Sequence, residues 1–204
     1  MKALGYVQAG GASTRFGQDK ALVKLGGQTM LERSCALLQE AIGNATIVVG
    51  AVRYEFPTAR HIEDRWPGEG PLGGIITALE DAKQQSQRGE WALIVSCDMP
   101  FLTTAWLKHI VELAEKSDAD AIVPRSDSGL EPLCACWRIA STEQLQTAFG
   151  AGVRKIGEAL QRVRMEVLDE PEWKRFDTAG RLFWNMNTPA DFEEIRKAWD
   201  AHKS

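Results

Sequence analysis

The chain has 204 residues, a formal net charge of -4, and a composition that is 44% hydrophobic and 25% charged. These values are ordinary for a soluble globular protein, so they exclude a disordered chain, and the negative charge argues against a general nucleic-acid binder, which would carry a basic face. No apolar run approaches the roughly 20 residues that cross a bilayer, and the first residues break too soon for a signal peptide, so we expect a cytoplasmic protein without a membrane partner.

Apolar runs alternate with helical periodicity along the chain. Predicted strands, rich in β-branched residues, lie at 3–7, 45–50, 91–96 and 120–124. Predicted helices, several opened by Thr or Pro, lie at 29–41, 71–85, 104–116, 141–149, 153–163 and 189–202. The alternation predicts an α/β fold in one domain over 1–204, with a mostly parallel sheet covered on both faces. In such sheets, ligands bind at the carboxyl ends of strands where the strand order reverses.

A glycine-rich stretch, VQAGGASTRFGQDKAL at 7–22, follows the first predicted strand. Paired glycines let the backbone approach another group closely, and Ser13, Arg15 and Lys20 add donors suited to phosphate oxygens. The spacing matches neither the P-loop nor the dinucleotide-binding G-x-G-x-x-G pattern. A plain turn between strand and helix is the alternative, but the density of donors favours a local anion site.

Asp98 lies in the stretch SCDMP at 96–100, which follows the apolar run ALIV directly. A lone carboxylate at the end of a buried strand needs a partner to offset the loss of water, and a cation is the natural one. Mg²⁺ usually binds through one or two carboxylates plus substrate phosphates, which Lys20 and Arg15 would hold. Alternatively, Asp98 caps the helix that begins near Thr103 or closes a turn before Pro100, and the residues alone leave both interpretations open.

Two weaker candidates lie between these motifs. Asp64 follows a short apolar segment, although its charged neighbours are equally consistent with a solvated cluster. Gly73, within PGEGPLGG at 67–74, lies at a helix start whose free N–H groups and bare backbone would let a base or sugar approach. A plain turn entering the helix is the alternative for this stretch.

Cysteine and histidine positions give no sign of a metal centre. The four cysteines are scattered, which predicts reduced, buried thiols, and a packing role is favoured over metal binding for the C-x-C pair. The histidines match no zinc spacing, and we assign none a catalytic role. These residues are Cys35, Cys97, Cys134, Cys136, His61, His109 and His202.

In chain order, the motifs QAGGASTRFGQDKAL, IED, GPLGGI, CDMPFL, EPLCA and NMNTPADF resemble those of the molybdenum cofactor guanylyltransferases, the MobA-like nucleotidyltransferases. The resemblance spans nearly the whole chain. It implies a Rossmann-like three-layer sandwich of the nucleotide-diphospho-sugar transferase type. It also implies an enzyme that transfers GMP from GTP to molybdopterin with Mg²⁺ as cofactor, releases pyrophosphate and passes its product to molybdoenzymes or their chaperones.

The resemblance also implies roles for individual residues. The nucleotide would contact Gln8, Ala9, Gly10, Gly11, Ser13, Lys20, Asp64, Gly73 and Asp98. Catalysis would rest on Lys20, Arg15 and Asp98, with Asp98 also holding the metal. The segments 125–137 and 185–192 are left for the acceptor, through Arg125, Glu131, Asn185 and Asn187. A helix start capped by Thr188 is a further interpretation of the second segment, and it does not exclude Asn185 facing the site.

The chain departs from the family pattern at Gln8, Phe16 and Gly50, where Leu, Met and, in some members, a nucleotide-contacting Asn are found. The change at Gly50 removes one possible contact to the base or ribose. Relatives with L-A-A-G transfer cytidylate, so cytidylyl transfer to the same cofactor and nucleotidyl transfer to another phosphorylated acceptor are alternatives. A non-catalytic nucleotide-binding regulator is a third, but the presence of both Lys20 and Asp98 argues against it.

Overall fold

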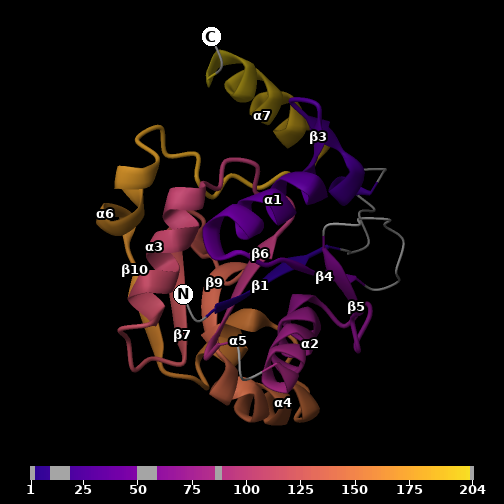
Figure 1. Ribbon diagram of the computed structural model, residues 1–204, viewed down its shortest axis with the longest axis vertical. Coiled ribbons are helices and arrows are strands. Elements are labelled where there is room, and N and C mark those ends of the chain that lie inside the picture. Colours follow the sequence, from indigo (N-terminus) through magenta and orange to yellow (C-terminus); the bar gives the residue numbers. More distant parts are fainter. Residues whose placement is uncertain (1–2, 10–18, 50–58, 86–88, 203–204) are drawn as a thin grey trace.

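The computed structural model describes residues 3–9, 19–49, 59–85 and 89–202 (Figure 1). Its main sheet contains eight strands. In spatial order they are β10 (Met165–Leu168), β7 (Ala121–Ser126), β9 (Cys134–Arg138), β6 (Trp91–Ser96), β1 (Ala3–Gln8), β4 (Thr46–Val49) and β5 (Arg60–Glu63), with β8 (Gly129–Leu130) paired to β7. Strands β6 and β7 pair antiparallel with β9, β8 pairs antiparallel with β7, and the other pairings are parallel, as predicted.

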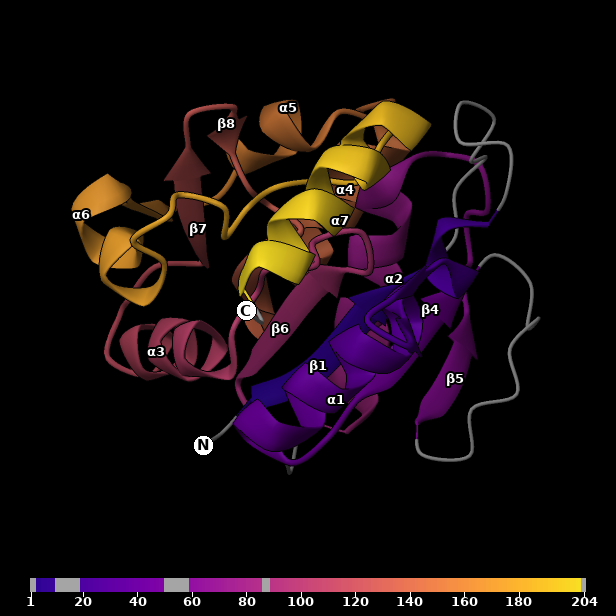
Figure 2. The same cartoon turned by 90° about the horizontal axis from the view of Figure 1, so that it is seen from above.

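Helices cover both faces of this sheet (Figures 1 and 2). On one face lie α1 (Met30–Ile42) and α3 (Thr104–Ala114), and on the other lie α2 (Pro71–Gln84), α4 (Thr142–Gly150) and α5 (Ile156–Leu160). An apolar core lies between the sheet and each layer of helices: the first core adjoins α1 and α3, and the second adjoins α2, α4 and α5. Because side chains alternate along a strand, Val7 of β1 packs into the first core and its neighbour Tyr6 into the second. The predicted three-layer sandwich is therefore confirmed.

Shorter elements complete the described chain. A hairpin of β2 (Lys24–Leu25) and β3 (Gln28–Thr29) turns at Gly26 and Gly27, which have positive φ angles of 62° and 91°. Helix α6 (Glu170–Trp173) precedes a loop leading to α7 (Pro189–His202), and three 3₁₀ turns occupy Lys20–Leu22, Ile139–Ser141 and Lys174–Phe176. No described helix has both the length and the apolar character that a membrane span requires.

One predicted helix is wrong in its extent. The segment 153–163 forms only the five residues of α5, because Lys155 before it has an extended backbone, with φ -81° and ψ 128°. Val153 and Val163 pack against the second core from outside the helix, so their apolar character reflects a tertiary contact. The predicted strands also omitted β5, β9 and β10. Strands β5 and β10 have partly exposed residues without a continuous apolar run, whereas β9 is short but buried.

The cysteine prediction is confirmed. Cys35, Cys97, Cys134 and Cys136 are free and buried, and burial raises the pKa of Cys35 to about 12. Cys134 accepts a hydrogen bond from the Trp106 indole at 3.4 Å. Within the described residues, no group of three or more His, Cys, Asp or Glu side chains could hold a metal.

The strand order reverses between β1 and β6, because β1 is followed in space by β4 and β5 on one side and by β6 on the other. At their carboxyl ends, Gln8 pairs with Ser96, and the Cys97 amide donates to the Gln8 carbonyl at 3.3 Å. The fold thus brings the end of β1 directly beside Asp98, at the position where open α/β sheets bind ligands.

Candidate active site

Asp98 lies two residues beyond Ser96, the last residue of β6. Its Oδ1 accepts from the Ser96 hydroxyl at 2.6 Å, and its Oδ2 lies 3.4 Å from the Lys20 ammonium nitrogen. The sequence left open whether Asp98 caps the helix that follows it. The cap of α3 is Thr103, whose hydroxyl accepts from the Trp106 amide at 3.2 Å. Asp98 is therefore not the cap of α3, and its carboxylate is held by side chains at the edge of the sheet.

Lys20 begins the first 3₁₀ turn, which Asp19 caps by accepting from the Ala21 amide at 3.0 Å. Besides the contact with Asp98, the Lys20 ammonium donates to Asn187 Oδ1 at 2.8 Å. The Lys20 and Asp98 side chains are each only 18% exposed, so their charges are partly shielded from water and interact more strongly than surface charges would. Three segments far apart in the sequence thus meet at one point.

Gln8 is the last residue of β1, and Ala9 follows it, on the side of the strand-order reversal opposite β6. Ala9 is buried, and its amide donates to the Val48 carbonyl at 3.0 Å. The Gln8 side chain reaches the start of α2, where Nε2 donates to the Pro71 carbonyl at 3.0 Å. It lies so close to Gly74 that a Cβ atom there would be 1.8 Å from Nε2. The glycine at position 74 therefore makes room for Gln8.

Asp64 and Gly73 also meet at the start of α2. Asp64 Oδ1 accepts from the Trp66 amide and from the Thr77 hydroxyl, each at 3.0 Å, so this carboxylate stabilises a turn after β5. A Cβ atom at Gly73 would lie 3.0 Å from the Trp66 Cβ and 3.8 Å from Asp64 Oδ1. Close packing against Trp66 explains this glycine, and the contacts of Asp64 are those of a residue that holds the turn before α2.

The remaining residues of the nucleotide motif lie outside the described part of the chain. They are Gly10, Gly11, Ser13 and Arg15, and the same holds for the departures Phe16 and Gly50. Their assigned roles stay predictions from the motif. Within the motif, the described residues Gln8 and Ala9 come before residues 10–18, and Lys20 comes after them.

Glu131 lies between β8 and β9, at the same edge of the sheet, and is 7% exposed. The Ser126 hydroxyl donates to Glu131 Oε1 at 2.5 Å. Burial raises the pKa of Glu131, the bond from Ser126 opposes the rise, and the negative charge of Asp98 adds to it. The Ser96 amide donates to the Leu133 carbonyl at 2.7 Å, so the segment that carries Glu131 lies beside the end of β6 and the two carboxylates share one region of the molecule.

Arg125 and Asn185 belong to two further segments near this region: Arg125 pairs with Leu130, next to Glu131, and Asn185 precedes Met186. Arg125, near the end of β7, has a side chain that is 53% exposed and lies 3.4 Å from Asp169. Asn185 donates through Nδ2 to the Phe183 carbonyl at 3.1 Å. The Met186 amide, next in the chain, donates to the Asp98 carbonyl at 2.9 Å and so brings the segment 185–187 to the site.

The predicted cap of α7 is confirmed. The Thr188 hydroxyl accepts from the Asp191 amide at 3.2 Å, and Asp191 Oδ2 accepts from the Thr188 amide at 2.7 Å. Asp191 Oδ2 also accepts from the Asn187 amide at 2.9 Å. The cap therefore orients Asn187 as well as starting the helix.

Two hydroxyl residues that sequence reasoning missed hold the carboxylates of the site. Ser96 supports Asp98 and Ser126 supports Glu131. Each is the last residue of a strand whose preceding residues are mainly apolar, β6 and β7 respectively. A polar residue that ends a buried strand is the sequence signal that would have identified both.

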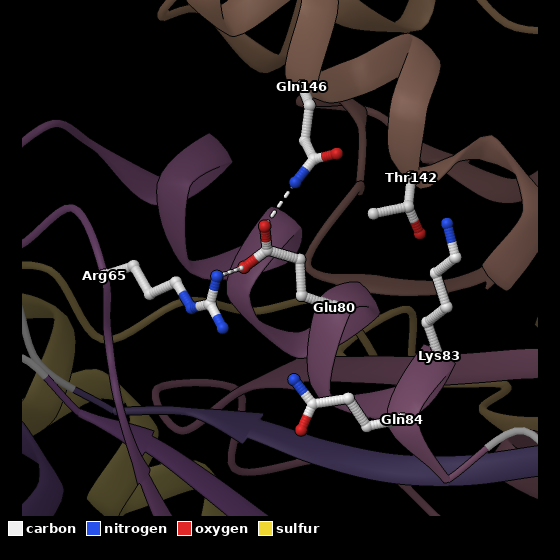
Figure 3. A pocket seen from close by; sticks show the side chains of 6 residues that line it. All are labelled: Arg65, Glu80, Lys83, Gln84, Thr142 and Gln146. Atoms are coloured by element: carbon white, nitrogen blue, oxygen red, sulfur yellow. Dashed lines mark hydrogen bonds and ion pairs between the residues drawn. The ribbon is translucent and has the colours of Figure 1, made fainter.

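A cavity of about 390 Å³ between α2 and α4 is not part of this site (Figure 3). Its charged groups pair with one another or with neighbours: Arg65 lies 2.8 Å from Glu80, and Gln146 donates to the same carboxylate. Lys83 pairs with Glu143 at 2.8 Å. These contacts join α4 to α2 beyond its first turn, whereas Gln8 and Gly73 lie at the helix start.

The contact between Gln8 and Gly74 allows a test of the nucleotide half. Gly74→Ala should displace the flexible end of Gln8 and break its bond to Pro71, and Gln8→Leu should remove the amide directly. If Gln8 serves the nucleotide, each variant should bind GTP about fivefold more weakly, the effect of ~1 kcal/mol. Calorimetric titration measures this, with thermal unfolding as control. Unchanged affinity in both variants would remove Gln8 from the site.

Comparisons with known proteins agree with this geometry. A family model described as the MobA-like NTP transferase domain matches residues 5–164. A Chloroflexus aggregans protein named "Probable molybdenum cofactor guanylyltransferase" is 32% identical, covering 96% of this chain and 94% of its own length. The "Molybdenum cofactor guanylyltransferase" of Desulfosudis oleivorans is 31% identical, covering 95% of this chain and 94% of its own.

Solved structures share the fold. Molybdopterin-guanine dinucleotide biosynthesis protein A of Archaeoglobus fulgidus is 27% identical with a TM-score of 0.80, covering 98% of this chain and all of its own. The 2-C-methyl-D-erythritol 4-phosphate cytidylyltransferase of Thermus thermophilus, 16% identical, gives a TM-score of 0.68 over 98% of this chain and all of its own. The fold is therefore that of nucleotidyltransferases. On the matched domain and the full-length relatives, the chain belongs to the MobA-like NTP transferase family, as its motifs predicted.

Proposed function

We propose that the protein transfers GMP from GTP to molybdopterin, forming the guanine dinucleotide cofactor and releasing pyrophosphate. The observation that carries the proposal is the partly buried pair of Lys20 and Asp98 at the reversal of strand order. A cation beside a carboxylate there suits a substrate that brings both phosphates and a metal. The names of the full-length relatives support the choice of guanosine triphosphate and molybdopterin.

The chemistry needs no protein nucleophile. The terminal phosphate of the pterin attacks the α-phosphorus of GTP in line, the new P–O bond forms, and the bond to pyrophosphate breaks. The protein acts by positioning the reactants and by offsetting charge. In this scheme the Lys20 ammonium turns toward the phosphates and offsets the negative charge that accumulates on the leaving pyrophosphate.

The residues present fit Mg²⁺. Asp98 offers a hard oxygen donor fixed by Ser96, and a single carboxylate is enough when the nucleotide phosphates supply further oxygens. Glu131 is a second carboxylate in the same region. When bound, Mg²⁺ would neutralise phosphate charge and make the α-phosphorus more electrophilic. The contribution of the chain is to hold the Asp98 carboxylate in place and to supply Lys20 opposite it.

Pyrophosphate release tests the proposal. The purified protein is mixed with molybdopterin, Mg²⁺ and each of the four ribonucleoside triphosphates in turn, and we expect the fastest release with GTP. Equal or faster release with CTP would assign the protein to cytidylyl transfer. Release with a different phosphorylated acceptor alone would change the acceptor. Nucleotide binding without any release would identify a regulator.

The acceptor side carries its own prediction. Arg125→Ala and Asn185→Ala should each raise the KM for molybdopterin while leaving GTP affinity unchanged, because β7, which carries Arg125, lies on the side of β6 away from β1, and the Asn185 amide donates within its own segment. The fall in kcat/KM should be about tenfold, the effect of a lost hydrogen bond to a charged group. Steady-state kinetics with each substrate varied separately measures this. An unchanged pterin KM in both variants would contradict the assignment. The acceptor, whose product is passed to molybdoenzymes, would then bind through other residues.

A further inference from the structure

The contact between Asn187 and Lys20 places Asn187 beside a residue of the nucleotide half of the site, whereas the sequence assigned Asn187 to the acceptor. The Lys20 ammonium lies 2.8 Å from Asn187 Oδ1 but 3.4 Å from Asp98 Oδ2, so the amide is the closer of the two partners. An amide oxygen is neutral. It can fix an ammonium group without cancelling its charge, and the full positive charge remains for a phosphate.

Asn187 is itself fixed from both sides along the chain. On one side, Met186 is fully buried and its amide donates to the Asp98 carbonyl. On the other, Asp191 accepts from the Asn187 and Thr188 amides. Burial raises the pKa of Asp191, but the Asn187 and Thr188 amides, the Thr188 side chain and the positive charge of Lys20 together more than offset this, so the pKa lies below its ordinary value. Asp191 is therefore ionised at neutral pH and holds the segment firmly.

Helix α7, which follows, is anchored to the N-terminal part of the chain. Ile195 is 2% exposed and packs with Val23 and Met30 in a third apolar cluster. The Arg33 guanidinium lies 4.1 Å from the centre of a Trp199 ring and donates to the Pro100 carbonyl at 2.7 Å. Figure 2 shows α7 running across the molecule near α1 and the end of β6. The Asn187 side chain thus reaches Lys20 from a supported position.

We propose that Asn187 is a positioning residue that holds Lys20 ready for the phosphates of the nucleotide, which makes the start of α7 part of the nucleotide half of the site. Lysine has a long, flexible stem and loses conformational freedom when it binds a ligand. Holding the ammonium in advance lowers that cost, so binding is tighter. The inference rests on the proposed function only for the identity of the nucleotide.

A double-mutant cycle on binding tests the proposal. Calorimetric titration with Mg²⁺ and GTP is performed on wild type, Asn187→Ala, Lys20→Ala and the double variant, and repeated with inorganic tripolyphosphate, which carries phosphates without a base. We expect Asn187→Ala to weaken binding by about tenfold and Lys20→Ala by more. The double variant should bind no more weakly than Lys20→Ala alone, because Asn187 acts through Lys20.

Asn185→Ala is the matched control, since Asn185 lies two residues away and donates to the Phe183 carbonyl of its own segment. Its affinity for GTP and tripolyphosphate should equal that of wild type. Thermal unfolding is measured for every variant, and that of Asn187→Ala should change little because Asn187 is exposed. In turnover assays Asn187→Ala should leave the pterin KM unchanged.

Two results would overturn the proposal. Wild-type phosphate affinity in Asn187→Ala with a raised pterin KM would return Asn187 to the acceptor side. Losses that multiply in the double variant would give Asn187 a role independent of Lys20. Failure of the protein to transfer GMP would overturn the proposed function, whereas the binding cycle with tripolyphosphate would still decide the role of Asn187.

Discussion

Asp98→Asn should fold normally and transfer guanylate roughly a hundredfold or more slowly than wild type. Asn keeps the shape of Asp and can still accept from the Ser96 hydroxyl, so the local structure at the end of β6 should survive. What is lost is the charge that balances Lys20 and that, as proposed, would hold the metal. A carboxylate ligand contributes several kcal/mol of transition-state stabilisation, and ~1.4 kcal/mol corresponds to a tenfold change in rate.

The measurement is guanylyl transfer at saturating Mg²⁺, with thermal unfolding to verify folding. Asp120→Asn is the matched control, because Asp120 precedes β7 at its amino end and pairs with Arg164 at 3.2 Å. It carries the same change of charge at the opposite edge of the sheet, so its turnover should stay near normal. A well-folded Asp98→Asn protein with near-normal turnover would end the metal assignment.

The layers of the fold followed from patterns that depend only on neighbouring residues. Strand β6 reads as a continuous apolar run because both of its faces are covered by helices, and α2 begins where Pro71 marks a helix start. The alternation of such elements is enough to predict a parallel sheet. From the sheet it follows that Gln8 and Asp98, which end two strands, lie at one edge.

The elements that the sequence did not indicate are those stabilised by distant contacts. Strand β10 pairs with β7 although it is short and partly exposed, and the two valines flanking α5 serve the second core. Local periodicity does not indicate partners that are distant in the sequence. The motif resemblance supplied the substrates, which neither periodicity nor charge could have named.

Within the site, residues were found individually but their pairings were not. The sequence singled out Lys20, Asp98 and Asn187, yet nothing in the spacing indicates that Asn187 contacts Lys20, 167 residues earlier. Likewise, Gly74 looks like a turn glycine until Gln8 is seen lying across it. Both contacts arise from the docking of α7 and α2 at the same edge of the sheet, a property of the assembled fold.

Lys20→Ala should also slow guanylyl transfer by roughly a hundredfold or more, because in the proposed mechanism it removes a donor to charge that grows in the transition state. Lys24→Ala is the matched control, since Lys24 lies four residues on, in β2, and is exposed. Its turnover should stay near normal. Initial rates at saturating GTP, Mg²⁺ and molybdopterin measure both variants.

Combining Lys20→Ala with Asp98→Asn tests whether the two groups serve one transition state. Lys20 and Asp98 lie 3.4 Å apart, and in the proposed mechanism both act on the phosphates of one nucleotide, so their losses should not be independent. Removing either one misplaces the triphosphate and already forfeits part of what the other contributes. The double variant should therefore lose less than the product of the two single losses. Losses that multiply would mean that Lys20 and Asp98 contribute separately, for instance one to binding and one to chemistry, and the shared site at the reversal of strand order would have to be abandoned.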